Sequence, residues 1–256
     1  MPTHVAPEIW ANSLGMKFKL VSPGKFVMGS PKSELRRFAD ETSHEVNITK
    51  PYYLSLYPTT QAQWRAVVGE NPSKYPGSKQ APVESVSWYD CATFIEKLNA
   101  EEYFHELQRF LGEGWHYAFP SEAQWEYACR AGTSTPYYFG DAASEKDGNF
   151  GKVNADVKGR TTTDVGSYPA NPWGFYDMFG NVCEWTNDYY GDYTLNQGVD
   201  PSGGARTAER VARGGSWRSV PENCRSASRF NFLSTYRGDN CGLRLAIITS
   251  SYRNVR

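Results

Sequence analysis

Long apolar runs are missing from this 256-residue chain, and no stretch approaches the roughly 18 apolar residues that a membrane span needs. Its first residues have no charged region followed by an apolar one, so no secretory signal is expected. An excess of one charge is also missing, because 27 Lys and Arg against 28 Asp and Glu leave a net charge of −1. Nucleic-acid binders carry basic patches, so nucleic acid is not an expected partner. We expect a cytoplasmic protein without a membrane span, although display on a cell or phage surface is not excluded.

Cysteine is scarce, with five residues at 91, 129, 183, 224 and 241, and none of them forms a Cys-x-x-Cys pair. That spacing favours neither a zinc site nor a dense disulfide framework. The odd number leaves at least one thiol unpaired. We expect most of the five to be small buried hydrophobic residues in a reducing compartment.

Turn-forming and aromatic residues are plentiful, with 23 Gly, 15 Pro and 15% aromatics. This composition favours a mixed α+β fold with few helices, short strands and long loops rather than a helical bundle. Residues 16–29 contain two strand-like pieces around Ser-Pro-Gly, which predicts a β-hairpin. Residues 45–49 and 52–56 predict further strands.

Three capping boxes, in which a Ser or Thr is followed three residues later by Gln or Asp, mark the starts of three helices. The helices are expected to begin at Thr60, Ser87 and Ser121. Beyond about residue 131 the helical signal ends, yet that part of the chain is rich in Trp, Phe and Tyr, which disordered segments lack. We therefore expect one domain over residues 1–256, with ordered loops in which bound metal could satisfy backbone carbonyls.

Six segments, taken in order, resemble the signatures of the formylglycine-generating-enzyme/sulfatase-modifying-factor family. They lie at residues 26–30, 82–88, 119–128, 173–185, 213–217 and 242–244. The resemblance runs from about residue 12 to residue 246. It implies a variant of the C-type-lectin-like fold, with little regular secondary structure and calcium ions holding the loops.

Calcium is the cofactor that this resemblance implies, in a structural role. The positions that match a family calcium site are Asp177, Gly180, Val182 and Glu184, the first and last through carboxylates and the middle two through carbonyl oxygens. Hard cations take such oxygen ligands. The alternative is that the two carboxylates bond only to local amides. A second site would fall near Asn149, Phe150 and Asp156.

The family's enzymes use two cysteines that bind copper and oxidise a substrate cysteine. Here the first of these positions, three residues beyond Gly-Gly-Ser, is Ser219, and a hydroxyl cannot replace the soft thiolate that copper(I) prefers. Cys224 stands five residues later, but it aligns better with a later stretch of the enzymes. We therefore expect no copper and no catalytic residues.

Residues 213–246 resemble the variable segment of proteins that diversity-generating retroelements modify. Arg-Gly-Gly-Ser-Trp at 213–217, Pro-Glu-Asn-Cys-Arg-Ser-Ala at 221–227 and Gly-Leu-Arg at 242–244 are the fixed parts. The positions that would vary, and bind ligand, are Arg218, Ser219, Val220, Ser228, Phe230, Phe232, Leu233, Thr235, Tyr236, Asp239 and Asn240.

Aromatics beside arginine are typical of binding hot spots, and mixtures of Tyr, Ser and Asn are typical of paratopes. Phe230 and Phe232 could instead be core residues. The sequence thus favours a non-catalytic protein that binds a protein or glycan. The alternatives are an oxidoreductase acting on cysteine and an undiversified regulatory module.

Overall fold

The computed structural model describes residues 7–100, 102–151, 160–193 and 198–249. Helices and short strands are separated by long loops, which confirms the α+β prediction. The helices are α1 (Gln61–Val68), α2 (Trp88–Ala100), α3 (Glu102–Leu111) and α4 (Glu122–Arg130), with one 3-10 helix, η1 (Pro221–Cys224). No helix among the described residues is long and apolar enough to cross a membrane.

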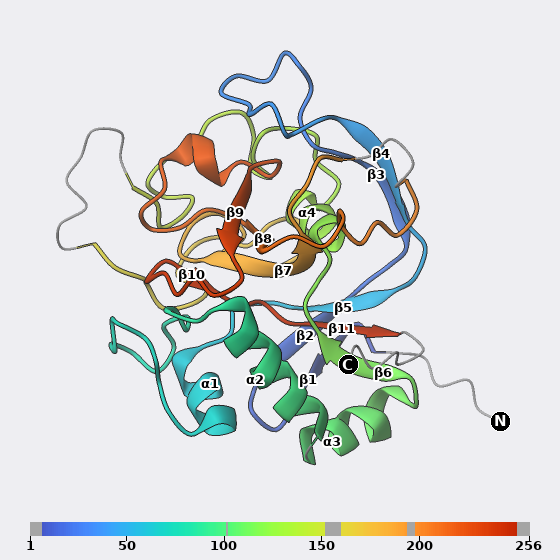
Figure 1. Ribbon diagram of the computed structural model, residues 1–256, viewed down its shortest axis with the longest axis vertical. Coiled ribbons are helices and arrows are strands. Elements are labelled where there is room, and N and C mark those ends of the chain that lie inside the picture. The colour runs from blue at the N-terminus through green and yellow to red at the C-terminus, as the bar shows by residue number, and fades with distance from the viewer. Residues whose placement is uncertain (1–6, 101, 152–159, 194–197, 250–256) are drawn as a thin grey trace.

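The first sheet has five strands and contains both the first and the last strand of the described chain. Its order is β1 (Ile9–Ala11), β2 (Lys17–Val21), β5 (Tyr52–Ser55), β11 (Ala246–Thr249) and β6 (Trp115–Ala118). Helices α1, α2 and α3 lie below this sheet in the view of Figure 1. Trp64 of α1 stacks on Phe94 of α2, with ring centroids 4.7 Å apart. A first hydrophobic core therefore fills the space between these helices and the sheet.

Two smaller sheets and most of the long loops lie above the first sheet in Figure 1. One is ordered β10 (Cys241–Gly242), β7 (Cys183–Tyr189), β8 (Glu209–Arg213) and β9 (Arg229–Leu233), with β10 and β7 parallel. The other pairs β3 (Gly24–Met28) with β4 (His44–Ile48). A second hydrophobic core surrounds α4.

The predicted hairpin at residues 16–29 is wrong, because its two strands belong to different sheets. Strand β2 pairs with β1 and β5, whereas β3 pairs with β4. The chain crosses between the sheets against α4, where a side chain at Gly24 would collide with the hydroxyl of Tyr127. Phe26 then packs on the ring of Tyr127 at 5.2 Å. Packing on α4 therefore outweighs local pairing across the turn.

All three predicted helix starts are confirmed. Thr60 and Ser121 each accept a hydrogen bond from the third helical residue, whose Gln side chain accepts one from the cap's backbone. Ser87 and Asp90 exchange the same pair of bonds at the start of α2. All five cysteines are buried and free, whereas the sequence predicted burial for most of them and at least one unpaired thiol.

Candidate functional site

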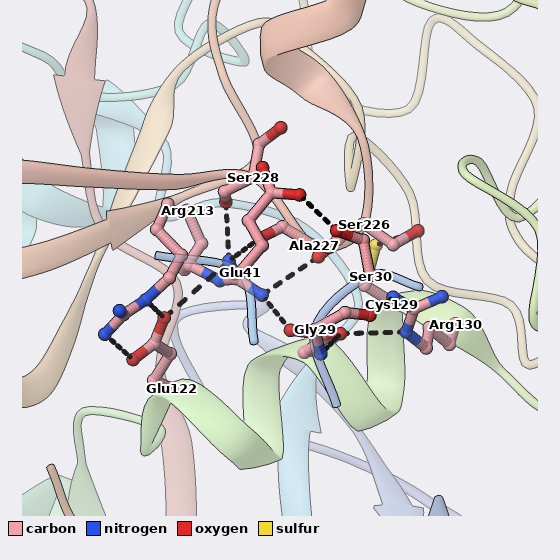
Figure 2. Close-up of polar contacts among 12 residues, drawn as sticks. Gly29, Ser30, Glu41, Glu122, Cys129, Arg130, Arg213, Ser226, Ala227 and Ser228 are labelled. Atoms are coloured by element: carbon pink, nitrogen blue, oxygen red, sulfur yellow. Dashed lines mark hydrogen bonds and ion pairs between the residues drawn. The ribbon is translucent and has the colours of Figure 1, made fainter. Parts of the chain in front are cut away.

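Arg213, at the end of β8, holds the segment 213–246 from inside the molecule. Its side chain is fully buried, and one guanidinium nitrogen donates to the carbonyls of Ala227 at 2.9 Å and Ser228 at 2.5 Å. The other donates to the Ser226 carbonyl at 2.9 Å and to the carboxylate of Glu126 on α4. Figure 2 shows the guanidinium directed at this run of carbonyls. The fixed parts of the segment are thus anchored to α4.

Two further arginines fasten the same segment. Arg225 pairs with Glu41 and Glu34 of the loop between β3 and β4, and Arg229 forms a two-bond pair with Glu122 at 2.7 and 2.9 Å. Burial acts to raise the pKa of Glu122, but Arg229 and Arg213 outweigh it, so that pKa lies below its usual value. The carboxylate therefore remains charged, as a buried partner of two arginines must.

Two of the residues predicted to bind ligand are buried, which corrects that part of the prediction. Ser228 is fully buried, and its hydroxyl donates to the Glu222 carbonyl at 3.2 Å. Ser219 is 9% exposed, and its hydroxyl accepts the Ser216 amide at 3.1 Å. Both hydroxyls serve the turns around η1, so neither side chain is displayed to a partner.

The aromatic residues of the segment form a row on and just beyond β9. Phe230 stacks on Phe232 at 6.1 Å, and Phe232 stacks on Tyr236 at 4.7 Å. The two phenylalanines are half-buried against the first core, where Phe232 meets Trp185 edge-on at 5.9 Å. Both the core and the surface interpretation of these two rings are therefore partly right. Tyr236 remains 38% exposed.

The loop after β9 is exposed and rests on the start of α2. Leu233 is 54% exposed, and Thr235 is also exposed. The Ser234 carbonyl accepts the Trp88 amide at 3.1 Å, and Arg237 forms two 2.7 Å bonds to Asp90. Tyr89, which lies between Trp88 and Asp90 at the start of α2, is 56% exposed. No local sequence signal links α2 to this loop, so the sequence analysis missed Tyr89.

Asp239 joins the two ends of the predicted variable segment. Its Oδ2 accepts from Arg218 at 2.7 Å, from Lys74 at 2.8 Å and from the hydroxyl of Tyr75 at 3.3 Å. Trp217 lies beneath, with its indole N–H on the Asp239 carbonyl at 3.1 Å. Arg218 is exposed, so a charged surface lies beside the aromatic row. Lys74 and Tyr75 come from a distant loop that the sequence analysis did not single out.

Val220 and Asn240 complete the set and are half-buried. The Asn240 side chain donates to Ser216 at 3.4 Å and accepts from the Tyr236 hydroxyl at 3.5 Å. We give the name binding face to the surface that is predicted to bind ligand, which comprises the exposed and half-buried side chains at these positions together with Tyr89. Its members are Tyr89, Arg218, Val220, Phe230, Phe232, Leu233, Thr235, Tyr236, Asp239 and Asn240.

One of the four predicted calcium ligands, Glu184, already has other partners. Both carboxylate oxygens of Glu184 are taken, by Arg244 at 2.8 Å twice and by the Trp125 indole at 2.5 Å. A guanidinium in that position repels a cation, so Glu184 does not fit as a ligand in this arrangement. Gly180 and Val182 are buried between Asp177 and β7.

Asp177 fits a cation better than Glu184 does. It is 4% exposed, and burial raises the pKa of its carboxyl to about 6. Among the described residues, its oxygens accept the Gly166 amide at 2.7 Å and the Asn181 side chain at 3.4 Å. A nearby calcium ion would hold this carboxyl charged. Calcium therefore stays a prediction, centred on Asp177.

The second predicted calcium site is only partly described. The Asn149 side chain donates to the Thr161 carbonyl at 2.9 Å, and the Phe150 carbonyl accepts from Arg160. Asp156 lies outside the described residues. In the described part of the chain, no group of three or more His, Cys, Asp or Glu side chains could hold a metal ion.

Ser219 stands at the first of the two positions that the resemblance assigns to catalysis, and Cys224, which aligns better with a later stretch, lies near it without forming a thiolate pair. Cys224 is buried, and burial holds the pKa of its thiol well above the usual value. The Cys224 sulfur packs against Gly215, where an added Cβ would lie only 2.4 Å from it. The next residue, Ser216, donates its amide to the Ser219 hydroxyl. A protonated thiol and a serine hydroxyl at this point are poor ligands for copper.

Comparison with known proteins shows the family of the chain. The sequence profile described as a sulfatase-modifying factor enzyme 1-like domain matches residues 11–248. The formylglycine-generating enzyme of Streptomyces coelicolor is 32% identical over 200 residues, which cover 72% of this chain and 58% of the enzyme. The serine/threonine-protein kinase pkn1 of Chlamydia caviae is 28% identical over 252 residues. That match covers 87% of this chain and 36% of the kinase, so the chain spans little more than a third of that protein.

A solved structure shares the architecture over almost the whole chain. Treponema denticola variable protein 1 superposes with a TM-score of 0.77 and 24% identity, covering 94% of this chain and 99% of the other. Together with the mixed sheets, few helices and long loops, this likeness confirms the predicted fold. The chain belongs to the sulfatase-modifying factor enzyme 1-like (FGE-sulfatase) family and has the C-type-lectin-like fold of that family.

Proposed function

We propose that this chain is a ligand-binding protein whose binding face is diversified, as in the variable proteins of diversity-generating retroelements. The observation that carries the proposal is the division of residues 213–246 into two classes. The residues of its fixed motifs are mostly buried, whereas nine of the eleven positions assigned to variation are exposed or half-buried. Such a division lets surface residues change without loss of the scaffold.

The chemistry of the binding face supports a protein or glycan ligand. Tyr236 and Tyr89 offer flat, amphipathic rings with few rotatable bonds, which is how paratopes gain contact area at low entropic cost. Arg218 and Asp239 add a charged pair beside the rings, with 43% and 12% of their side chains exposed. An aromatic centre with a polar rim is the usual anatomy of a protein-binding surface.

The similarity to formylglycine-generating enzymes supports family membership and keeps an oxidoreductase role as the alternative. That role requires a copper-binding pair of thiolates. Ser219 cannot form a thiolate, and the buried Cys224 keeps its proton at neutral pH because its pKa is raised. We therefore propose that the chain does not catalyse cysteine oxidation.

The decisive test compares copies of the gene and its flanking DNA. We expect a reverse-transcriptase gene near this gene, together with a near-copy of the end of its coding sequence. The gene and the near-copy should differ mainly at codons of the binding face, and at those codons the near-copy should contain adenine. Buried positions such as Arg213 and Arg225 should not differ. Equal variation inside and outside residues 213–246 would refute diversification.

A biochemical measurement separates the alternative. The purified chain loaded with copper is incubated with oxygen and a peptide that contains the cysteine of a sulfatase motif, and loss of the thiol is followed by mass spectrometry. We expect no turnover beyond that of free copper. Turnover that Ser219→Ala leaves unchanged but Cys224→Ala abolishes would establish the enzyme instead.

A further inference from the structure

Strand β9 is the last strand of its four-stranded sheet, and β8 is its neighbour on one side (Figure 1). The Ser234 amide donates to the Ala208 carbonyl at 2.9 Å, whereas the Glu209 carbonyl accepts the Tyr190 amide at 3.1 Å from the side of β7. Backbone groups of an antiparallel pair point alternately toward the partner strand and away from it. The even-numbered residues of β9 therefore bond to β8, and the odd-numbered residues point to the other edge.

Asn231 turns both of its backbone groups to this other edge. In the part of the chain that the structure describes, its amide and its carbonyl have no partner, and neither does the amide of Leu233. The Leu233 carbonyl differs, because it accepts the Tyr236 amide at 2.8 Å. Asn231 and Leu233 are exposed, so this stretch of the edge lies at the surface. One donor and acceptor, and a second donor two residues later, are left for a partner.

Other outer strands are protected against pairing. At β6 the Asn99 side chain accepts the Tyr117 amide at 2.9 Å and donates to the Tyr117 carbonyl at 2.8 Å, as a neighbouring strand would. Strand β3 carries the exposed Lys25, and lysine on an outer strand opposes pairing. Strands β1 and β10 have only three and two residues, and very short edge strands also resist pairing.

Strand β9 has none of these protections. It is five residues long, and its one charged side chain, Arg229, is buried in the ion pair with Glu122. Asn231 is not one of the eleven positions assigned to variation, yet it stands between Phe230 and Phe232, which are. The unprotected edge thus runs along the binding face.

An extended peptide matches the free groups of this edge. A strand presents a donor and an acceptor toward the same side at every second residue, about 6.8 Å apart. A helix uses its backbone groups internally, and a glycan has no such repeat. Main-chain bonds to Asn231 and Leu233 also stay the same when the side chains of the face change. The edge would supply constant affinity, and the variable side chains would supply specificity, as in strand addition generally.

We propose that the binding face takes an extended segment of a protein, which adds to the free edge of β9 as a further strand. The segment donates to the Asn231 carbonyl and accepts from the amides of Asn231 and Leu233. Its alternate side chains lie beside the row of Phe230 and Phe232. This inference rests on the proposed function, and it narrows the ligand from a protein or glycan to a protein in extended conformation.

The test uses a neutral strand-forming probe, acetyl-Thr-Val-Thr-Val-Thr-amide, in three forms with identical side chains. One is unmodified, one is N-methylated at alternate amides, and one is N-methylated at every amide. NMR of the isotope-labelled chain follows the amide signals of Asn231 and Leu233 and their hydrogen exchange. We expect the first two forms to shift and protect these amides, because each keeps one edge with free N–H groups. The fully methylated form should bind at least about tenfold more weakly, because it cannot donate to Asn231 and its methyl groups hold the two backbones apart.

A proline variant tests the same edge from the side of the chain. Asn231→Pro removes an amide that takes no part in pairing with β8, and proline is tolerated at such positions of outer strands. It should weaken binding of the unmodified peptide at least about tenfold, read from the Leu233 signal. Lys25→Pro is the matched control on β3, where the paired Asn47 turns its backbone to Gly198 and Asp200, and it should bind like the unchanged chain. Thermal unfolding verifies that both variants fold, and the methylated peptides test the bond in the unchanged chain.

Four outcomes overturn the inference. They are no response of Asn231 and Leu233 to the unmodified peptide, equal binding of the fully methylated form, undiminished binding by folded Asn231→Pro, and protection of the Asn231 amide in the concentrated chain without peptide. The last result would assign the edge to a second copy of the chain. The proposed function fails separately, on the gene copies. Variation of the face without peptide binding would remove the strand addition alone, and peptide binding without variation would remove diversification alone.

Discussion

Asp188, near the end of β7, is a buried carboxyl that forms no ion pair with a cation in the described part of the chain. It is 2% exposed, and its Oδ2 accepts the Glu122 amide at 2.7 Å. Burial, and then the charge of Glu122, raise the pKa of Asp188 to about 7, while Arg229 and Arg210 lower it only in part. Between these two pKa values the folded state keeps the Asp188 carboxyl protonated. In the unfolded chain, where the pKa of this carboxyl has its ordinary value of 3.8, the proton is already lost.

This raised pKa predicts a pH dependence of stability. Because the folded state holds the extra proton, the contribution of Asp188 favours folding near pH 4 and is lost as pH rises through about 7. Asp188→Asn should therefore stabilise the chain more at about pH 8 than at about pH 5. Urea unfolding of the variant and of the unchanged chain at both pH values measures this effect. The difference between their free energies of unfolding cancels the contribution of all groups that titrate alike in both. Exposed Asp192→Asn is the control; an equal pH slope in Asp188→Asn and the unchanged chain would contradict the assignment.

The sequence predicted which residues belong to motifs, but it did not predict which charged residues are buried. Arg213, Arg225 and Arg229 stand in or beside motifs, yet an arginine is ordinarily a surface residue. They are buried because Glu41 and Glu122, more than 90 residues away in sequence, supply their partners. Tertiary pairing of this kind leaves no local pattern.

At the scale of elements, local hydrogen bonding decided what could be predicted. The helices that begin with a capping box were all found, because the box is contained in four consecutive residues. Helix α3 was missed, since it follows α2 almost directly and no such box precedes it. The hairpin was wrong because β3 packs on α4 through Phe26 and pairs with β4, whereas β2 pairs with β1 and β5.

Helix α4 carries both Glu122 and Glu126, so its start should affect the whole network of buried arginines. Ser121→Ala removes the hydroxyl that accepts the Gln124 amide at 3.1 Å. We expect a loss of about 1 kcal/mol in the free energy of unfolding, the usual value of a helix cap. Denaturant unfolding measures it, with Ser33→Ala at an exposed position as the control. A loss no larger than that of the control would show that tertiary contacts alone hold the helix start.

At the scale of the whole molecule, the fold followed from the order of the six motifs, and the binding face could be predicted only in part. Its aromatic row lies in consecutive sequence and was found. Tyr89 belongs to the face through the contact of Ser234 with Trp88, and Lys74 borders the face through its bond to Asp239, each across more than 140 residues. A surface assembled from three distant segments has no signature in any one of them.

The division between scaffold and surface makes a prediction for the molecule as a unit. Arg218→Ser, Leu233→Ser and Thr235→Ala combined should cost about 1 kcal/mol or less, because exposed side chains and exposed ion pairs contribute little. Arg213→Met alone should cost about 3–5 kcal/mol, because it leaves the buried charge of Glu126 with Arg130 as its one remaining cation. Urea unfolding of both variants compares the two losses directly. If the triple variant is the less stable, the side chains of the face themselves support the fold. That result would contradict the proposal that the scaffold tolerates diversification of the face. If it is the more stable, three positions of the face can change together at a lower cost than the single buried Arg213.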